Sequence, residues 1–534
     1  MFRIIGYDST PRFIPDEVTI SNSGSFDRTK KERHVVVDAS IPIPGVVFTH
    51  NNSVPNLIRG LGERLFKVPV GDGFAAPPRP VVFDVGTYAD KVVKKMPRFE
   101  SPITADAFVA LYSGPKRKRY QSAADRIMQN AGVGANWADI QVFIKDEKVQ
   151  SWSKSDPAPR LISPRSPEYC LELGRYIKPI EHLLYKAVAR VWGDVTICKG
   201  LNFNERGQLL RSKWESFRDP VAIGADASRF DQHVSELALQ WEHSIYRRCY
   251  VGKHKYLAYL LRQQLVNKGI SYLDGKSIKY SVKGCRMSGD MNTALGNCLI
   301  MTAIVWYFLQ SKQIKGKLAN DGDDCVIFIE RADLAEFQSG FAEFCLERGF
   351  TMKLEDPVDE FEQLEFCQCH PVWNGEQWTM ARNVTKALFT DACHVGRSVE
   401  ELSAIRYAIG DSGLSWGRGI PIFPSYYRFV QKSGRRNEKM MQKRDLMKGS
   451  GTYWNARGCN SGTSDITDGA RLSFYRAFGI TPAEQVTIEN YYDSLVPGVL
   501  EFSNSPVLPY SPHSPCCEYP LFIDSALNTV VFNR

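Results

Sequence analysis

The chain carries Asn320-Asp321-Gly322-Asp323-Asp324-Cys325-Val326-Ile327-Phe328-Ile329, a tight polar turn followed by a β-branched and aromatic run. Asn, Asp and Gly tolerate the positive φ angles of hairpin turns, and the run that follows predicts a buried strand. We therefore expect a strand–turn–strand hairpin with adjacent carboxylates at its tip. Neighbouring carboxylates repel each other, so this arrangement persists most easily around a divalent cation. A Gly-Asp-Asp triplet arises by chance in roughly one chain in ten of this length, and the alternative is a solvated acidic turn.

Composition sets the class of protein. The chain has 534 residues with 43% hydrophobic and 24% charged residues, as in an ordinary soluble globular protein. Its formal net charge of +8 suits a polyanionic partner where the charge is clustered. The thirteen cysteines are odd in number and lack framework spacing, which indicates mostly reduced thiols in a cytosolic setting.

Several segments give no sign of a special site. Residues 1–34 are polar and predict a poorly ordered lead-in or the junction to something upstream. Residues 72–82 are rich in Pro and Gly and predict a loop or linker. The run Ala294–Leu309 is too short and too interrupted for a membrane span, so we expect a buried core helix and no transmembrane segment. Cys367-Gln368-Cys369-His370 lacks a second pair of ligands at zinc spacing, which favours a core strand carrying thiols. The Pro- and Ser-rich tail 503–517 predicts irregular structure on the surface.

Other segments predict regular elements around the acidic turn. Helical apolar spacing predicts helices over 173–191, with a kink at Pro179, and over 234–250. Residues 220–225 predict a strand, and Asp274-Gly275 within 273–282 predicts a second hairpin. After the acidic hairpin, an amphipathic helix should end at Arg348-Gly349, with Gly349 as its C-cap.

Basic residues cluster in three places. Lys116-Arg117-Lys118-Arg119 is either a solvated face or a nucleic-acid contact. Residues 145–165 form an extended basic segment that prolines hold away from helix. Residues 432–448 carry seven basic side chains against two acidic ones, the densest positive patch in the chain. Its candidate contacts for a polyanion are Lys432, Arg435, Arg436, Lys439, Lys443 and Arg444.

Three segments combine into one constellation. Asp226 and Asp231 follow a predicted strand; Ser288-Gly289, Thr293 and Asn297 lie in a loop and the start of a helix; Asp323 and Asp324 occupy the hairpin tip. Each segment alone is weak evidence, but their order and spacing are specific. Thr293 and Asn297 are four residues apart, so they share one helix face.

This set resembles motifs A, B and C of viral RNA-dependent RNA polymerases. Motif A matches as Asp226-x4-Asp231, motif B as Ser288-Gly289-x3-Thr293-x3-Asn297, and motif C as Gly322-Asp323-Asp324. Residues 341–353 resemble motif D, 364–367 motif E and 145–165 motif F. The sequences Lys145-Asp146-Glu147-Lys148 and 156–160 are similar to those in polymerases of plant viruses of the tombusvirus-like group (Tombusviridae), of luteovirus or dianthovirus type.

The resemblance implies an α+β right-hand polymerase with fingers, palm and thumb, whose antiparallel palm sheet is flanked by helices. It implies an N-terminal extension and fingertips in 1–90, fingers with motif F in 91–219, the palm in 220–380 with a fingers insert at 240–285, and the thumb and tail in 381–534. The basic patch 432–448 of the thumb would then line a channel for RNA. It also implies a two-metal-ion transfer of nucleotides from rNTPs on an RNA template, with de novo initiation.

The resemblance assigns roles to the motif residues. Asp226 and Asp323 would hold two Mg²⁺ ions, or Mn²⁺ as a substitute, with Asp324 assisting and Asp321 acting only as a turn residue. Asp231 and Asn297 would recognise the 2′-hydroxyl, supported by Ser288, Gly289 and Thr293. Lys154, Arg160 and Arg165 would bind the triphosphate. Lys353 is either the general acid for the leaving pyrophosphate or a solvated lysine at a helix end.

The resemblance also bears on partners. It implies template and product RNA, rNTPs, and an upstream viral replication protein to which frameshifting or readthrough fuses such polymerases. The polymerase would then act in the host cytoplasm, at membrane-associated viral replication complexes, and would contact the membrane only indirectly. Two alternatives stay open: a reverse transcriptase or DNA polymerase, and a non-catalytic RNA-binding replication subunit.

Overall fold

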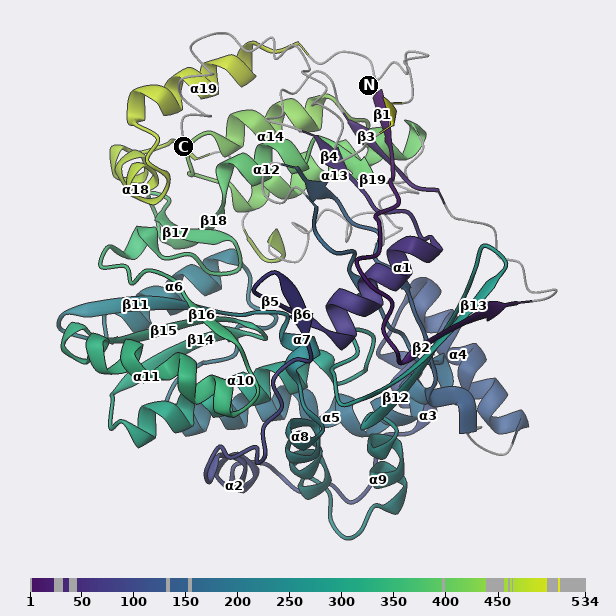
Figure 1. Cartoon of the computed structure of the whole chain (residues 1–534). Coiled ribbons are helices and arrows are strands. Elements are labelled where there is room, and N and C mark those ends of the chain that lie inside the picture. The colour runs from purple at the N-terminus through teal and green to yellow at the C-terminus, as the bar shows by residue number, and fades with distance from the viewer. Residues whose placement is uncertain are drawn as a thin grey trace.

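The computed structural model describes most of the chain, as a mixture of helices and sheets that agrees with the α+β class. Figure 1 shows the whole molecule. The described residues are 2–23, 32–37, 46–130, 135–151, 156–395, 399–437, 456–459, 462, 464–496 and 508–509.

The central sheet is built on the predicted acidic hairpin. Its strand order is β14-β15-β11-β16, and every neighbouring pair is antiparallel. The turn between β14 and β15 has Gly322 at φ +96°, a backbone conformation that favours glycine. The predicted hairpin and the strand beside it are therefore confirmed. The bounds are β11 Pro220–Ala227, β14 Gly316–Asp321, β15 Asp324–Glu330 and β16 Met352–Leu354.

Both faces of this sheet are covered, which explains why residues 325–329 of β15 are apolar on both faces. Along β15, Ile327 and Ile329 contribute to one hydrophobic core, whereas Val326 and Phe328 contribute to another. The first core includes helices α5, α10 and α11, and the second includes helix α6 and strands β17 and β18 (Figure 1). The bounds are α5 Pro167–Trp192, α6 Phe203–Trp214, α10 Thr293–Ser311, α11 Leu334–Glu347, β17 Cys369–Trp373 and β18 Trp378–Arg382.

Helix α10 contains the apolar run of the sequence. Among the described residues it is the one helix whose length and composition would allow it to cross a membrane, and 72% of its apolar window is buried inside the molecule. The prediction of a core helix is confirmed. Helix α11 ends as predicted, with Gly349 at φ +87° directly after the C-cap residue Arg348.

A second sheet has the order β2-β13-β12-β7, in which β7 is Ile140–Gln141. Strands β12 (Val266–Leu273) and β13 (Lys276–Lys283) form the second predicted hairpin, and its two turn residues, Asp274 and Gly275, have φ values of 49° and 70°. Helices α8 (Glu236–Arg248) and α9 (Lys255–Arg262) precede this hairpin.

The N-terminal segment contradicts the expectation of a poorly ordered lead-in. Strand β2 (Val18–Asn22) pairs with β13, about 250 residues away in sequence. Strand β1 (Phe2–Ile5) lies inside a third sheet of order β19-β3-β1-β20. Backbone pairing with distant strands orders these residues, and no local pattern announces it. The bounds of the other strands are β3 His34–Val37, β19 Cys393–Val395 and β20 Leu508–Pro509.

Three smaller expectations are also corrected. Residues 73–75 of the predicted loop form strand β6, which pairs with β5 (Val68–Val70). Strand β17 begins only at Cys369, because Cys367 and Gln368 have φ values of 53° and 61° and form a turn. In the predicted irregular tail, the described residues 508–509 pair with β1, and the other residues of 503–517 lie outside the described ones.

The described part of the C-terminal third is mainly helical, and its helices contribute to the second core. Figure 1 shows these helices in green to yellow. The division into fingers, palm and thumb stays a prediction at this point. The helices are α12 Val384–Thr390, α13 Val399–Trp416, α14 Phe423–Lys432, α18 Asp468–Phe478 and α19 Pro482–Ser494. The remaining elements near the site are α1 Val54–Leu61, the π-helix Gly62–Phe66, α4 Gly114–Gln129, α7 Phe230–His233, β8 Phe143–Ile144, β9 Val149–Gln150 and β10 Leu161–Ile162.

Candidate active site

The acidic turn is shaped from inside by Asn320. This side chain is fully buried, and its amide nitrogen donates to the carbonyl oxygen of Gly322 at 2.7 Å and contacts the Cys325 sulfur at 3.0 Å. The backbone N–H of Gly322 in turn donates to the Asn320 Oδ1 at 3.3 Å. The turn is thereby closed, and Asp323 and Asp324 are left exposed at the end of the sheet.

Strand register brings the motif A carboxylate to the same place. Asp226 lies opposite Asp324 of β15 and, on its other side, opposite Lys353 of β16. Directly opposed residues of antiparallel strands project from the same face of a sheet, about 4.5–5.5 Å apart at their Cβ atoms. Two acidic side chains and one basic side chain from three separate segments therefore share one face beside Asp323.

The electrostatics of this cluster suit a divalent cation. Partial burial, together with the neighbouring charges of Asp323 and Asp321, raises the pKa of Asp324 to about 6. Repulsion of this kind is relieved when hard oxygen donors share a cation. Within the described residues, no group of three or more His, Cys, Asp or Glu side chains is already set around one point as metal ligands. The donor set of Asp226, Asp323 and Asp324 fits a hard divalent cation, and binding would draw the three carboxylates together.

Asp321 has a different role from its neighbours. Its carboxylate forms ion pairs with the Lys199 ammonium and, at 2.6 Å, with Arg206 of α6. Although burial alone would lower the pKa of Lys199, the Asp321 carboxylate raises it. The expectation that Asp321 is only a turn residue is therefore wrong: it anchors the hairpin to the segment 199–206. No local pattern signals these ion pairs, because both cations lie more than a hundred residues away from Asp321.

The two predicted ribose-recognition residues are in direct contact. Asn297, in the second turn of α10, donates from Nδ2 to the Asp231 Oδ1 at 3.0 Å. Burial raises the pKa of Asp231, opposed in part by the hydrogen bond from Asn297 and the charge of Arg286. The structure thus joins motifs A and B through one hydrogen bond.

Ser288, Gly289 and Thr293 hold the loop before α10. Thr293 donates to the carbonyl oxygen of Met287 at 2.7 Å, and the Ser288 hydroxyl accepts from the backbone N–H of Ser163 at 3.2 Å. A Cβ at Gly289 would lie 2.6 Å from the Cα of Pro164. This loop therefore packs directly against the end of the basic segment.

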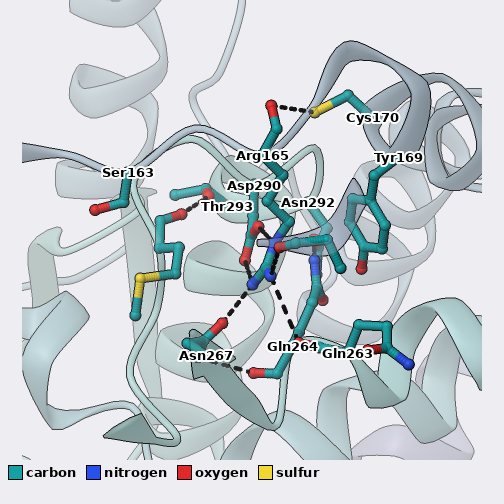
Figure 2. A network of polar contacts seen from close by, with 12 residues as sticks. Ser163, Arg165, Tyr169, Cys170, Gln263, Gln264, Asn267, Asp290, Asn292 and Thr293 are labelled. Carbon is teal, nitrogen blue, oxygen red and sulfur yellow. Dashed lines mark hydrogen bonds and ion pairs between the residues drawn. The ribbon is translucent and has the colours of Figure 1, made fainter. Parts of the chain in front are cut away.

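The basic segment places its predicted phosphate ligands in different environments. Arg160 is exposed, and its guanidinium lies 3.5 Å from Glu147. Arg165 is instead buried, with only 1% of its side chain exposed, and forms an ion pair with Asp290. It also donates to the carbonyl oxygen of Ala138 at 2.7 Å and to Asn267. Figure 2 shows Asp290 and Asn267 beside its guanidinium. Lys154 lies outside the described residues.

The placement of Arg165 differs from the role that the resemblance assigned. Its donors are bound to protein acceptors, and its guanidinium packs 5.3 Å from the ring centre of Tyr169. In this arrangement Arg165 ties the basic segment to the loop 288–292 rather than facing a phosphate. Sequence alone does not show that Arg165 is buried while Arg160, five residues earlier, is exposed.

A cavity of about 620 Å³ opens beside Arg160. Four further basic side chains line it, and among the described lining residues only one carboxylate, Glu147, does so. Lys148 comes from the same basic segment as Arg160. The other three come from distant parts of the chain, so the sequence did not single them out: they are Arg64, Arg382 and Lys386.

The remaining candidates are placed as follows. Lys353 is exposed in β16 rather than at the end of a helix, and it lies opposite Asp226. Lys432 ends α14, and Arg435 and Arg436 follow it with exposed side chains. Lys439, Lys443 and Arg444 lie outside the described residues.

Comparisons with known proteins agree with this geometry. A family model described as "Viral RNA dependent RNA polymerase" matches residues 23–497. The RNA-directed RNA polymerase of Tobacco necrosis virus (strain A) is 39% identical over 90% of this chain and 66% of its own length. Those of Melon necrotic spot virus and Tomato bushy stunt virus (strain Cherry) are 41% and 39% identical over 83% and 90% of this chain, and over 57% and 59% of their own lengths. The chain thus spans less than two thirds of the length of these curated relatives.

Proposed function

The chain belongs to the viral RNA-dependent RNA polymerase family, and we propose that it synthesises RNA on an RNA template from rNTPs, replicating a positive-strand viral genome with de novo initiation. One observation carries the proposal. Asp226 of β11 faces Asp324 of β15, beside Asp323 in the turn, so three acidic side chains meet at one edge of an antiparallel sheet. The relatives named above are RNA-directed RNA polymerases of tombusvirus-group viruses, which supports the same function. A luteovirus or dianthovirus origin stays a prediction.

In this proposal the central sheet β14-β15-β11-β16 is the palm of a right-hand polymerase. The fingertips and N-terminal extension are assigned to 1–90 and the fingers to 91–219. The palm is assigned to 220–380 with a fingers insert at 240–285, and the thumb and tail to 381–534. The support is that α5, α10 and α11 cover one face of the sheet and α6 the other.

Asp226 and Asp323 would hold Mg²⁺, or Mn²⁺ in its place, with Asp324 as the auxiliary ligand. Bound Mg²⁺ would stabilise charge on the attacking 3′ oxygen and on the leaving pyrophosphate. The chain's own residues fix the position of these ligands. Strand pairing sets Asp226 against Asp324, and the ion pairs of Asp321 hold the turn against Lys199 and Arg206.

Recognition of the ribose rests on Asp231 and Asn297. The 2′-hydroxyl is both a donor and an acceptor, and this pair offers a carboxylate oxygen and an amide that are already 3.0 Å apart. Ser288 and Thr293 support them by fixing the loop before α10. Such a polar site accepts ribose, which favours an RNA polymerase over a reverse transcriptase.

Entry of the triphosphate is assigned to the basic cavity. Arg160 and Arg64 present planar guanidinium groups, which suit phosphate oxygens geometrically. Lys154 stays a proposed contributor. Arg165 contributes indirectly, by holding the segment against Asp290.

Lys353 is proposed as the general acid for the leaving pyrophosphate. Its support is its place opposite Asp226, which sets an exposed ammonium beside the metal-binding face. The basic residues at the end of α14 and after it are proposed RNA contacts, because positively charged side chains bind the phosphates of RNA.

The proposed partners are template and product RNA, rNTPs and an upstream viral replication protein. The proposed place of action is the membrane-associated replication complex in the host cytoplasm. The family resemblance motivates both, and co-purification of the chain with an upstream replication protein from infected tissue tests them.

A purified-protein assay tests the activity. The chain is mixed with unprimed template RNA, Mg²⁺ and four rNTPs, and labelled product is measured. The wild type should incorporate rNTPs, whereas Asp323→Asn should lose more than about a thousandfold of the rate, because a two-metal site loses a ligand. RNA binding, measured by filter retention, should stay largely intact.

Three outcomes of this assay would contradict the proposal. A preference for dNTPs would indicate a reverse transcriptase or DNA polymerase. RNA binding without incorporation would indicate a non-catalytic replication subunit. Equal loss of binding and synthesis in Asp323→Asn would argue against a role of this residue in metal binding.

A further inference from the structure

A fully buried ion pair lies directly behind the proposed ribose-recognition residues. Arg286, two residues before Ser288, pairs with Glu242 of α8, and both side chains are 0% exposed. Isolated buried charges are costly, so such a pair persists only where its remaining donors and acceptors are satisfied. Here the Glu242 carboxylate also accepts from the Tyr246 hydroxyl at 2.6 Å and from the Asn292 amide at 2.7 Å.

The pair is packed against the helix that carries Asn297. A Cβ at Gly296 would lie 2.3 Å from Arg286 Nη2 and 2.4 Å from Glu242 Oε1, so only glycine leaves room for the pair there. On the far side of Asn292, its amide oxygen accepts from Gln264 at 2.8 Å (Figure 2 shows both residues). The carboxylate and the guanidinium are thus fixed on several sides.

Arg286 divides its donors between two acceptors. The terminal nitrogens donate to Glu242, and Nε donates to the Oδ1 of Asn297 at 3.0 Å. The Nδ2 of the same amide donates to Asp231 at 3.0 Å. The two bonds define which end of the amide is oxygen and which is nitrogen, because an amide nitrogen cannot accept from Arg286 and an amide oxygen cannot donate to Asp231.

We propose that Arg286 is a positioning residue for sugar selection: it fixes the Asn297 amide so that its NH₂ group faces Asp231 and the 2′-hydroxyl of the incoming nucleotide. This rests on the proposed function of the Asp231–Asn297 pair. Of the two hydrogens on Nδ2, one is used by Asp231, and the other is the donor for the ribose. Without Arg286, Oδ1 loses its donor, and the amide can rotate its oxygen toward the ribose.

Two variants test the proposal while guarding against misfolding. Arg286→Lys keeps the charge beside Glu242 but offers one ammonium in place of the fork, so it cannot hold Asn297 as well. The double variant Arg286→Met with Glu242→Met removes both charges together, a change that is often neutral for folding. Tyr246→Phe is the matched control, since it removes one bond to Glu242 and leaves the bond from Arg286 to Asn297.

The measurement is the ratio of kcat/KM for ATP to kcat/KM for 2′-deoxy-ATP in primed RNA extension by the full chain. Both Arg286 variants should lower this ratio about tenfold, the factor expected for one weakened hydrogen bond near the reacting sugar. Most of the change should be in KM for ATP. Tyr246→Phe should keep the wild-type ratio. Asn297→Ala, which removes the amide itself, should give the lowest ratio of the series.

The outcomes separate this proposal from the proposed function. A wild type that makes no RNA or does not prefer ATP would overturn the proposed function itself. Suppose that the wild type prefers ATP to 2′-deoxy-ATP and that Asn297→Ala does not. An unchanged ratio in the folded Arg286 variants would then overturn the role of Arg286. Equal loss of the ratio in Tyr246→Phe, or failure of both Arg286 variants to fold, would make Arg286 a structural residue only.

Discussion

At the scale of single residues, the partners of a carboxylate decide its role. Asp321, Asp323 and Asp324 are adjacent in sequence, yet only Asp321 is held by two cations, Lys199 and Arg206. Asp324 has carboxylates as its nearest charges, and its pKa is raised to about 6. The turn thus combines one anchoring acid with two acids that are available to a metal.

The anchoring role of Asp321 predicts a loss of stability in Asp321→Asn. The change leaves Arg206 and Lys199 without their carboxylate, and charged hydrogen bonds of this kind contribute about 2 kcal/mol. The free energy of unfolding from urea titration should fall by about that amount, and RNA synthesis should fall with it. Retention of wild-type stability and activity would show that the anchor is dispensable.

The raised pKa of Asp324 predicts pH-dependent Mg²⁺ binding. Because its pKa is raised, the ionised carboxylate that Mg²⁺ requires is disfavoured in the metal-free protein and forms only as pH rises through about 6. The increase in Tm on adding Mg²⁺ should therefore be small at about pH 5 and large at about pH 7.5. In Asp324→Asn this pH dependence should weaken; an equal Mg²⁺ effect at both pH values in the wild type would contradict the role.

The sequence predicted the residues that meet at the site better than it predicted their orientation. Asp226, Asp231, Asn297 and the acidic turn do come together, because strand pairing and one helix turn place them. Arg165 was expected at a phosphate but is buried against Asp290. Side chains of an extended segment point alternately to opposite sides. Which side faces the protein interior depends on partners far away in the sequence, and the local sequence does not reveal them.

At the scale of elements, turns with strong local chemistry were predictable and long-range strands were not. Both hairpins follow from Asp-Gly or Gly-Asp turns with positive φ, and α10 follows from its apolar run. Strands β1 and β2 were missed because their order depends on β3 and β13. Short strands that pair far along the chain carry little periodicity of their own.

Two glycines in the middle of helices predict opposite effects on packing. A Cβ at Gly207 of α6 would lie 2.5 Å from the Cα of Thr379 in β18, whereas at Gly340 of α11 the nearest atom would be 3.6 Å away. Gly207→Ala should therefore destabilise the protein by about 2 kcal/mol through overpacking. Gly340→Ala should stabilise it by about 0.5 kcal/mol, because glycine lowers helix stability.

Thermal and urea unfolding of the two glycine variants provide the comparison. The second core, which contains Phe203 and Leu210 of α6, lies under the contact with β18. If Gly207→Ala were as stable as Gly340→Ala, the close approach of α6 to β18 would not describe the protein in solution.

At the scale of the whole molecule, residues near the N-terminus hold the part of the basic segment that precedes Arg160. Asp156 accepts from the Tyr7 hydroxyl at 3.0 Å and from Arg59 of α1 at 2.6 Å. Arg59 also bonds Glu63 at 3.0 Å, and 2% of its side chain is exposed. The loop before Arg160 is therefore positioned by residues about a hundred or more places earlier, which explains why its environment could not be predicted from its own sequence.

This arrangement predicts that Arg59→Met weakens both stability and nucleotide binding. Removing this buried cation leaves Glu63 and Asp156 with only the longer ion pairs of Arg12, at 3.7 Å to each, and of Arg229 with Glu63 at 3.9 Å. Breaking a buried ion pair by removing one partner typically costs about 3 kcal/mol. The loop before Arg160 should then loosen, so KM for rNTPs should rise more than kcat falls. Arg331→Met is the matched control, since Arg331 pairs with Asp219 and Asp359 on the surface and its loss should leave Tm and KM unchanged. A fall in Tm without a change in KM would separate the stability of the fold from the position of the basic segment, and would show that Arg160 is held by other contacts.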